Sequence, residues 1–175
     1  MLPREQDLEL AAARLVAAAS LRGVTLATAE SLTGGLLGQL ICSVPGASAV
    51  YRGGVISYAS EVKASVLGVP VGLLASRGAV DPEVAQHMAQ GTARVCGADY
   101  GVSTTGAAGP EPWDGKPVGR VYLAVAGDGQ VFSVEKNYAG DRQSIRQQAA
   151  RDALVLLADA LEDELPSYGA CIGGV

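Results

Sequence analysis

The sequence predicts an α/β domain built on a mixed sheet that is partly parallel and contains one antiparallel hairpin. Strand-like and helix-like segments alternate along most of the chain, which is the pattern of a layered α/β fold. An Asp-Gly pair at 128–129 stands between two strand-like runs and is typical of a hairpin turn. With 175 residues, 49% of them hydrophobic, the chain has the size and apolar content for one core. We expect one domain over residues 1–165 and a loose tail at 166–175.

The first 42 residues predict a helix, a strand and a second helix. Residues 4–22 carry apolar side chains at helical spacing, and Gly23 suits the end of a helix. The apolar run at 24–29 has the length of a buried strand, and the run at 36–42 is typical of a short helix. Gly34-Gly35 lies between them, so a turn that contains glycine joins this strand to this helix.

The middle of the chain predicts a second strand followed by helices. Residues 50–58 form a strand-like run, and residues 61–67 fit a short helix. Residues 70–77 are expected to form a turn or a short helix. At 81–83 a capping Asp, a Pro at the first helical position and a Glu together indicate the start of a helix that runs to about Val95.

The last part of the chain predicts strands, a polar loop and a long helix. Residues 99–104 form a strand-like run, and the proline-rich segment 110–117 is a polar loop that holds the one tryptophan of the chain. Residues 119–126 and 130–138 are expected to be the two strands of the hairpin. A final helix is expected from 140 to about 164, because apolar side chains recur on one face there.

Composition and charge exclude several classes of function. The 13 Lys and Arg against 18 Asp and Glu give a net charge of −5, which gains no attraction from nucleic-acid phosphates. The three cysteines lie far apart and form no C-x-x-C pair, so neither a zinc ribbon nor a disulfide framework is indicated. Charged residues interrupt the N-terminus and no run of about 18 apolar residues occurs, so we expect neither a signal peptide nor a membrane span. We therefore expect a cytoplasmic protein with reduced thiols that binds neither nucleic acid nor a membrane.

Three polar turns that contain glycine are the places where chemistry is expected. They are Glu30–Gly35, Thr105–Pro110 and Gly140–Arg142, and the first two follow predicted strands. In open α/β sheets, ligands bind beyond the carboxyl ends of parallel strands. The first turn also precedes a helix, whose free N–H groups can hold an anion or a developing oxyanion. Taken singly, each turn also fits an ordinary capped turn without a function.

The available residue types point to a serine with a lysine as its base. The single histidine, His87, lies beside the buried face of a predicted helix, which fits a surface or rim position better than a serine–histidine triad. No clustered metal ligands, H-E-x-x-H pattern or phosphate-loop pattern occurs. Ser31 follows the first predicted strand and Lys63 the second, so neighbouring parallel strands would bring both to one rim, with Tyr58 beside them. A neutral lysine can take the proton of a serine if burial lowers its pKa.

Two of these features have other interpretations. Ser60 and Lys63 have the S-x-x-K spacing of penicillin-binding proteins, although the companion motifs of those enzymes are absent. Lys63 also fits a solvated lysine at the start of a helix. Arg142 and Arg146 share a face of the last helix, where they either bind a phosphate or form a solvated surface.

Six segments of the chain together form a recognisable pattern: Glu30–Gly35, Tyr58 with Lys63, Gly78–Val80, Thr105–Pro110, Lys116–Gly119, and Gly140–Arg142 with Arg146. In this order they resemble the CinA C-terminal domain family, whose characterised members are nicotinamide mononucleotide deamidases. The resemblance runs from about residue 5 to 162. Leu32 and Ser60 depart from the family pattern, which often has Cys and Asn at these positions.

This resemblance implies a three-layer α/β/α sandwich, often a homodimer, that hydrolyses nicotinamide mononucleotide to nicotinic acid mononucleotide and ammonia in pyridine nucleotide salvage. It places the nucleophile on Ser31 and the general base on Lys63, with Tyr58 beside them, and it needs no metal or cofactor. Backbone N–H groups from Thr33 to Gly35 are expected to hold the oxyanion. Substrate contacts are expected from Glu30, Thr33, Gly34, Gly35, Thr105, Gly106, Arg142 and Arg146.

Other functions stay open. In many bacteria the domain of this family is the C-terminal half of a longer protein, so the chain is either a standalone enzyme or one domain of such a protein. A non-catalytic domain that binds a nucleotide or a partner is an alternative of another class, because the family name refers to competence and DNA damage. An amidase for a different nucleotide amide is a third alternative.

Overall fold

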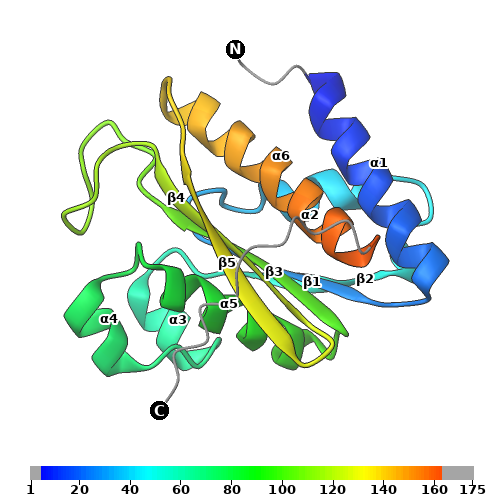
Figure 1. Ribbon diagram of the computed structural model, residues 1–175, viewed down its shortest axis with the longest axis horizontal. Coiled ribbons are helices and arrows are strands. Elements are labelled where there is room, and N and C mark those ends of the chain that lie inside the picture. The colour runs from blue at the N-terminus through cyan, green and yellow to red at the C-terminus, as the bar shows by residue number, and fades with distance from the viewer. Residues whose placement is uncertain (1–4, 163–175) are drawn as a thin grey trace.

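The computed structural model describes residues 5–162. Helices and strands alternate through most of this range, as Figure 1 shows. In chain order the elements are α1 (Glu5–Arg22), β1 (Leu26–Glu30), α2 (Leu36–Cys42), a 3₁₀ helix (Ala47–Ala49), β2 (Tyr51–Ile56), α3 (Ser60–Ser65), α4 (Val71–Arg77), α5 (Pro82–Cys96), β3 (Tyr100–Gly106), β4 (Arg120–Gly127), β5 (Gln130–Asn137) and α6 (Arg142–Leu161).

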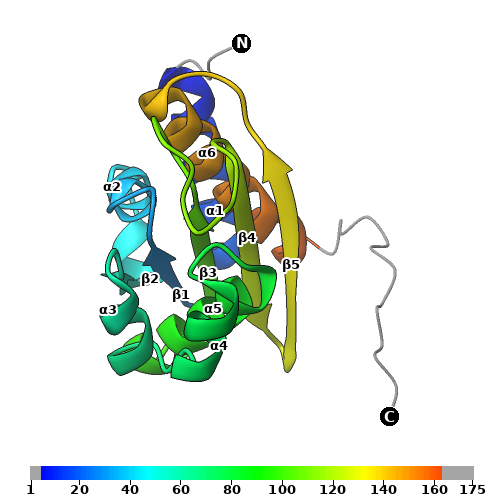
Figure 2. The same ribbon diagram turned by 90° about the vertical axis from the view of Figure 1, so that its left-hand side faces the viewer.

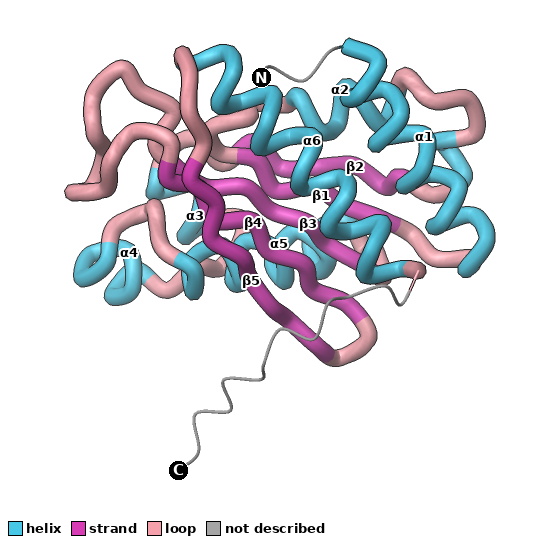
Figure 3. The backbone as a smooth tube through the Cα atoms, turned by 45° about the horizontal axis from the view of Figure 1, so that its top comes forward, coloured by secondary structure: helices cyan, strands magenta, loops and turns pink. Residues whose placement is uncertain are grey.

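The strands form one mixed sheet in the order β2-β1-β3-β4-β5. β1 lies between β2 and β3 and is parallel to both. β4 pairs antiparallel with β3 and with β5. The sheet, magenta in Figure 3, is therefore partly parallel with one hairpin, as the sequence predicts. The carboxyl ends of its three parallel strands meet at one edge.

Helices cover both faces of the sheet and give the molecule three layers. α1, α2 and α6 lie on one face, and α3, α4 and α5 lie on the other (Figures 1 and 2). This arrangement confirms the α/β/α sandwich. None of the helices between residues 5 and 162 has both the length and the apolar character that crossing a bilayer requires. The main apolar cluster lies between α1, α6 and the sheet and includes the fully buried Leu15, Val102, Leu123, Ile145 and Leu157.

Capping side chains fix the starts of the long helices α5 and α6. The Asp81 carboxylate accepts the N–H groups of Glu83 and Val84, at 2.8 and 3.4 Å, and a proline is the first residue of α5. The Asp141 carboxylate accepts the Ser144 N–H at 2.8 Å at the start of α6. Each cap of this kind stabilises a helix by about 1 kcal/mol. The helix starts expected at residues 81–83 and near residue 140 are confirmed.

A glycine in β2 allows this edge strand to approach β1 closely. A Cβ added to Gly54 would lie 2.1 Å from the Thr28 Oγ1 of β1 and 2.8 Å from the Tyr51 hydroxyl. Any larger residue would therefore push the two strands apart. Because β1 leads into Ser31 and β2 leads into the segment with Tyr58 and Lys63, the spacing of the two strands controls how close these segments lie.

The structure differs from the expected boundaries in two places. β2 ends at Ile56, two residues earlier than expected, and the chain then turns through Ser57 into α3, which contains Lys63 as the predicted helix at 61–67 did. Of the two possibilities expected at 70–77, the structure forms the helix, α4. The last helix ends at Leu161 instead of near 164. The tail expected at 166–175 lies outside the described residues.

Candidate active site

Three strand ends supply the polar side chains of one cavity. Ser31 follows β1, Tyr58 follows β2, and Thr105 lies near the end of β3. With Lys63 of α3 and Arg142 of α6 they line a cavity of about 490 Å³, and Gly106 lines it too. This volume suits a small-molecule ligand. The structure therefore brings these predicted residues together at one rim.

Ser31 and Lys63 are in direct contact. The Lys63 Nζ lies 3.0 Å from the Ser31 Oγ, although the two residues are 32 positions apart in the chain. The parallel pairing of β1 with β2 brings the two segments together. Lys63 is fully buried, whereas Ser31 is 9% exposed and lines the cavity. Ser60 is exposed and makes no hydrogen bond to Lys63, so the geometry favours Ser31 over the S-x-x-K interpretation.

The surroundings of Lys63 suit a proton acceptor. Burial lowers the pKa of Lys63 from 10.5 to about 8, while the negative charge of Asp114 acts in the opposite direction. With such a pKa, about a tenth of the molecules carry a neutral amine at pH 7. Burial of Lys63 in the folded chain therefore supplies the lowered pKa that a proton-accepting lysine requires.

The hydrogen bonds of Lys63 fit both protonation states. Its Nζ also donates to the carbonyl of Ser57, at 2.5 Å, and to the carbonyl of Tyr58, at 3.3 Å. A neutral amine has two N–H donors for these carbonyls and a lone pair left for the Ser31 hydroxyl proton. An ammonium group has three donors for the same three oxygens. The amine can therefore gain or lose a proton without moving.

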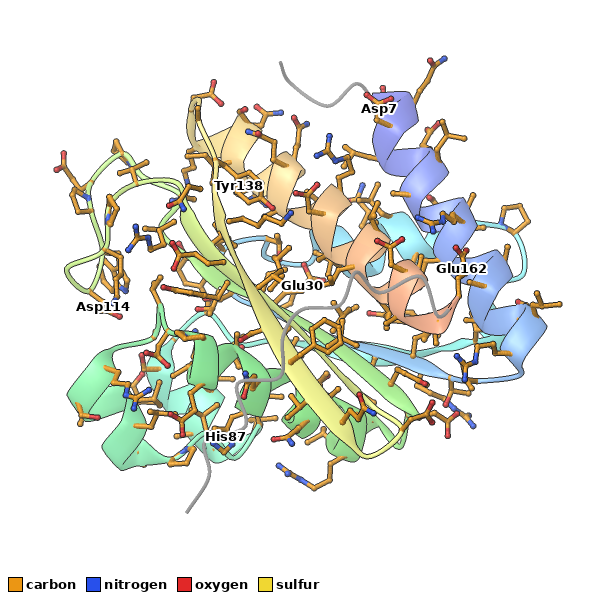
Figure 4. All side chains as sticks on the ribbon, in the orientation of Figure 1. Asp7, Glu30, His87, Asp114, Tyr138 and Glu162 are labelled. Carbon is orange, nitrogen blue, oxygen red and sulfur yellow. The ribbon has the colours of Figure 1, made fainter. Side chains whose placement is uncertain are left out.

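Glu30 supports the turn after β1 and does not face the cavity. Its carboxylate is 2% exposed and accepts the N–H groups of Gly35, Leu37 and Gly38 at 2.9 to 3.0 Å. These free N–H groups form the positive end of α2, where a buried negative charge is stabilised. The structure therefore does not bring the Glu30 carboxylate to the cavity, because it is bound to backbone N–H groups in the interior (Figure 4).

The glycines of this turn are also structural. The Gly34 N–H donates to the Ser31 carbonyl at 3.2 Å, and the Gly35 N–H is held by Glu30. Both glycines have positive φ, 60° and 101°, which side chains with a Cβ rarely adopt. The N–H groups of Gly34 and Gly35 are thus bound within the turn, and neither glycine is among the residues that line the cavity.

The oxyanion donor is better placed on the residue directly after Ser31. Thr33 is fully buried, and its hydroxyl lies 2.8 Å from that of Thr104, so its side chain is not a substrate contact. Leu32 lines the cavity, and among the described residues its N–H has no hydrogen-bond partner. The N–H of the residue that follows a serine nucleophile serves as oxyanion donor in other hydrolases. The free donor is thus Leu32, nearer to Ser31 than expected.

The two arginines of α6 have different roles. Arg142 is exposed at the cavity, and its guanidinium donates to the Tyr58 hydroxyl at 2.9 Å and to the Gly109 carbonyl at 2.7 Å. Arg146 instead donates to the carbonyls of the two residues that follow Ser31, at 2.9 and 2.8 Å. Arg146 therefore fastens the Ser31 turn to α6 through its Nε and one terminal nitrogen, and it is not among the residues that line the cavity. Arg142 keeps the position needed to meet an anion.

The loop at 107–119, between β3 and β4, forms a wall of the cavity that the sequence left without a role. Glu111 and Trp113 of this loop line the cavity. The Asp114 carboxylate accepts the Ala79 N–H at 2.6 Å, across the cavity rim. The Asp-Gly pair at 114–115 was the one pattern that indicated a tight turn here. Ser57 was also missed: within residues 5–162 its buried hydroxyl has no hydrogen-bond partner.

His87 takes no part in the cavity. It is half-buried on α5, in the helical layer that also holds α3 and α4, as Figure 4 shows. This half-buried place on α5 agrees with the expected rim or surface position on that helix, and within residues 5–162 His87 makes no hydrogen bond to a serine. Among residues 5–162, no group of three or more His, Cys, Asp or Glu side chains is placed to hold a metal ion.

Comparison with known sequences gives consistent matches. A family model described as the CinA C-terminal domain matches residues 8–161. Relatives named CinA-like protein are 51% identical over 136 residues in Frankia casuarinae and 50% identical over 154 residues in Anaeromyxobacter sp. (strain K). These matches cover 78% and 87% of this chain but 31% and 37% of the relatives. The chain therefore spans about a third of the length of the curated relatives it matches.

Comparison with solved structures agrees. A CinA superfamily protein from Klebsiella pneumoniae has a TM-score of 0.86 and 34% identity, with 89% of this chain and 98% of that one covered. The competence/damage inducible protein CihA from Agrobacterium tumefaciens has a TM-score of 0.85 and 36% identity, with 93% and 98% covered. Both structures match nearly their whole length, unlike the longer curated relatives.

Proposed function

The chain belongs to the CinA C-terminal domain family, and we propose that it is an amidohydrolase that converts nicotinamide mononucleotide to nicotinic acid mononucleotide and ammonia. The observation that carries this proposal is the 3.0 Å contact between the buried Lys63 amine and the Ser31 hydroxyl at the cavity. A mere binding domain has no need of a desolvated lysine beside a serine, because burial of its charge destabilises the fold.

The proposed reaction has two halves that use the same pair. Ser31 Oγ attacks the carboxamide carbon while its proton passes to the neutral Lys63 amine. The tetrahedral intermediate then breaks its C–N bond, and Lys63 returns the proton to the departing nitrogen, which leaves as ammonia. In the second half a water gives its proton to Lys63 and attacks the acyl-enzyme, and the proton then returns to Ser31 Oγ. The carboxylate product leaves with the pair restored.

One backbone donor supports the negative charge that forms on the carbonyl oxygen. The Leu32 N–H lies on the residue next to the nucleophile and is unoccupied among the described residues. Losing one oxyanion donor typically lowers turnover by about 100- to 1000-fold. Because Leu32 is the next residue after Ser31, the backbone itself holds this N–H beside the nucleophile, and no other side chain is needed to position it.

The cavity walls suit the rest of this substrate. The Tyr58 and Trp113 rings are 61% and 63% exposed at the cavity and offer flat faces to the pyridinium ring, which is a cation. Arg142 offers its guanidinium to the single phosphate. Thr105 supports the part of the cavity wall that Ala79 forms, because its hydroxyl donates to the Ala79 carbonyl at 2.7 Å.

An ammonia assay on purified protein tests the proposal. Wild-type protein should release ammonia from nicotinamide mononucleotide with and without a chelator. Ser31→Ala and Lys63→Ala should each lower the rate by at least about 1000-fold while the circular dichroism spectrum stays that of a folded protein. Ser60→Ala is the matched control, because it removes an exposed hydroxyl three residues from Lys63, and it should keep the rate within about threefold.

Two outcomes would contradict the proposal. Full activity of Ser31→Ala with loss in Ser60→Ala would assign the nucleophile to the other serine. Binding of nicotinamide mononucleotide by calorimetry without ammonia release by the wild type would favour the non-catalytic alternative.

A further inference from the structure

The tip of the 107–119 loop presents one carboxylate at a fixed place. Trp113 and Lys116 form an antiparallel bridge, with N–H to carbonyl distances of 3.1 and 2.8 Å in the two directions. The two residues between them, Asp114 and Gly115, both have positive φ, 49° and 69°. This is the backbone of the tight hairpin turn that Asp-Gly favours. The turn therefore fixes the backbone conformation of Asp114.

The Asp114 carboxylate fits into a turn on the opposite wall of the cavity. It accepts the Ala79 N–H at 2.6 Å. Gly78, the residue before, has φ 76°, and a Cβ there would lie 2.8 Å from the Asp114 side chain. The Ala79 carbonyl is held in turn by Thr105, so both polar groups of Ala79 are bound. Ala79 itself lines the cavity. A turn without a Cβ at residue 78 thus receives a carboxylate from a loop 35 residues away.

We propose that Asp114 is a positioning residue of the site, whose carboxylate fastens the 107–119 loop to Ala79 and so fixes Glu111 and Trp113 as a wall of the cavity. Figures 1 and 4 show this loop reaching beyond the sheet, with Asp114 on the side that faces α3 and α4. The base of this loop is anchored, because Ala107 and Ala108 are buried and the Gly109 carbonyl accepts from Arg142, whereas its tip at Trp113 and Asp114 is exposed. One charge-assisted hydrogen bond at its tip therefore has a large share in placing it.

Asp114 also acts on the reacting pair through its charge. Burial lowers the pKa of Lys63, and the Asp114 carboxylate opposes that effect because it favours the protonated amine. The other charged side chains around the cavity are Glu61 of α3, Glu111 of the loop and Arg142 of α6. Removing the charge of Asp114 should therefore lower the pKa of Lys63 further, and a purely structural role for this residue would not produce that change.

The first experiment needs no enzymatic activity. Trp113 is the only tryptophan of the chain and precedes Asp114, so its fluorescence reports the loop directly. In Asp114→Ala the steady-state anisotropy of Trp113 should fall and acrylamide quenching should increase. Asp128→Ala is the matched control, because Asp128 has the same φ of 49° in an Asp-Gly turn at the other end of β4. It should leave both readings unchanged.

The second experiment rests on the proposed function and uses nicotinamide mononucleotide. In Asp114→Ala the KM should rise about five- to tenfold with kcat within about twofold, as expected when one hydrogen bond that orders a binding wall is lost. Asp114→Asn keeps an oxygen for the Ala79 N–H and tolerates positive φ, so its KM should change less. Its kcat/KM profile should nevertheless move to lower pH, because the charge is gone. Asp128→Asn should keep the wild-type profile.

The outcomes separate the two proposals. Asp114→Ala with wild-type anisotropy, quenching and KM would overturn the positioning role. An Asp114→Asn profile that coincides with the wild type would overturn the action on Lys63. If the wild type releases no ammonia, the proposed function fails, and the positioning role is then decided by the fluorescence of Asp114→Ala and Asp114→Asn alone.

Discussion

The burial of Lys63 should appear as a pH dependence of protein stability. The perturbation is Lys63→Met, which keeps the length of the side chain and removes the amine. In the folded protein burial lowers the pKa of Lys63 from 10.5 to about 8, whereas the unfolded chain keeps the ordinary value. Between these two values the unfolded state holds a proton that the folded state has lost. The free energy of unfolding of the wild type therefore rises with pH across this range.

The size of the effect follows from the gap between the two pKa values. A difference from 10.5 to about 8 corresponds to about 3 kcal/mol in full, and most of it is gained by pH 10. Below pH 7 both states hold the proton and the slope vanishes, so the cost of burying the charge is then fully present. The stability of the wild type minus that of Lys63→Met should increase by about 2 to 3 kcal/mol between pH 7 and pH 10.

Urea unfolding followed by circular dichroism at pH 7, 8, 9 and 10 measures this difference. Taking the difference cancels the titration of the tyrosines and of the other lysines that both proteins share. Lys136→Met is the matched control, which should not reproduce the rise, because it removes a surface lysine whose side chain is 40% exposed and lies 3.6 Å from the Asp152 carboxylate. A wild-type minus Lys63→Met difference that stays flat or falls from pH 7 to pH 10 would refute the desolvation of this amine, and with it the proton acceptor.

Two further predictions concern the same site. The kcat/KM for nicotinamide mononucleotide should rise about tenfold per pH unit below pH 7 and level off above about pH 8, because Lys63 must lose its proton to act. A rate assay from pH 6 to 9.5 measures this profile. A maximum at pH 6 would contradict the prediction. Glu30→Gln should lower the free energy of unfolding by about 3 kcal/mol, because an amide cannot accept three N–H groups with both of its terminal atoms. Urea titration checks this against Glu9→Gln on the exposed face of α1, and equal midpoints for the two variants would contradict it.

The fold was accessible from sequence because its main features are set by local patterns. The Asp81 cap, the Asp128-Gly129 turn and the apolar face of α6 each specify one element, and the structure contains all of them. The position of Ser31 beside Lys63 was also accessible, because it depends only on two parallel strands ending at the same edge. What local patterns could not supply is the direction in which a side chain points once the turn has closed.

The residues whose side chains do not point where the sequence predicted illustrate this limit. Glu30 and Ser31 are neighbours at the end of β1, yet one side chain enters the interior and the other reaches the cavity. Arg142 and Arg146 share a helix face, but Arg146 donates to two carbonyls of the turn after β1, whereas Arg142 lines the cavity. The contact of Asp114 could not be predicted from the sequence, because its partner, the Ala79 N–H, is a backbone group that carries no sequence information.

A lysine suits the place beside Ser31 for reasons of hydrogen-bond geometry as well as pKa. The amine must satisfy the carbonyls of Ser57 and Tyr58, which the turn from β2 into α3 points at it, and still meet the Ser31 hydroxyl. A neutral imidazole has one N–H and one lone pair, so a histidine would leave one carbonyl unpaired, and a guanidinium would keep its proton at every relevant pH. Only the primary amine fills all three positions in both of its protonation states. The backbone around residue 63 therefore selects lysine, and burial then brings its pKa to where the chemistry needs it.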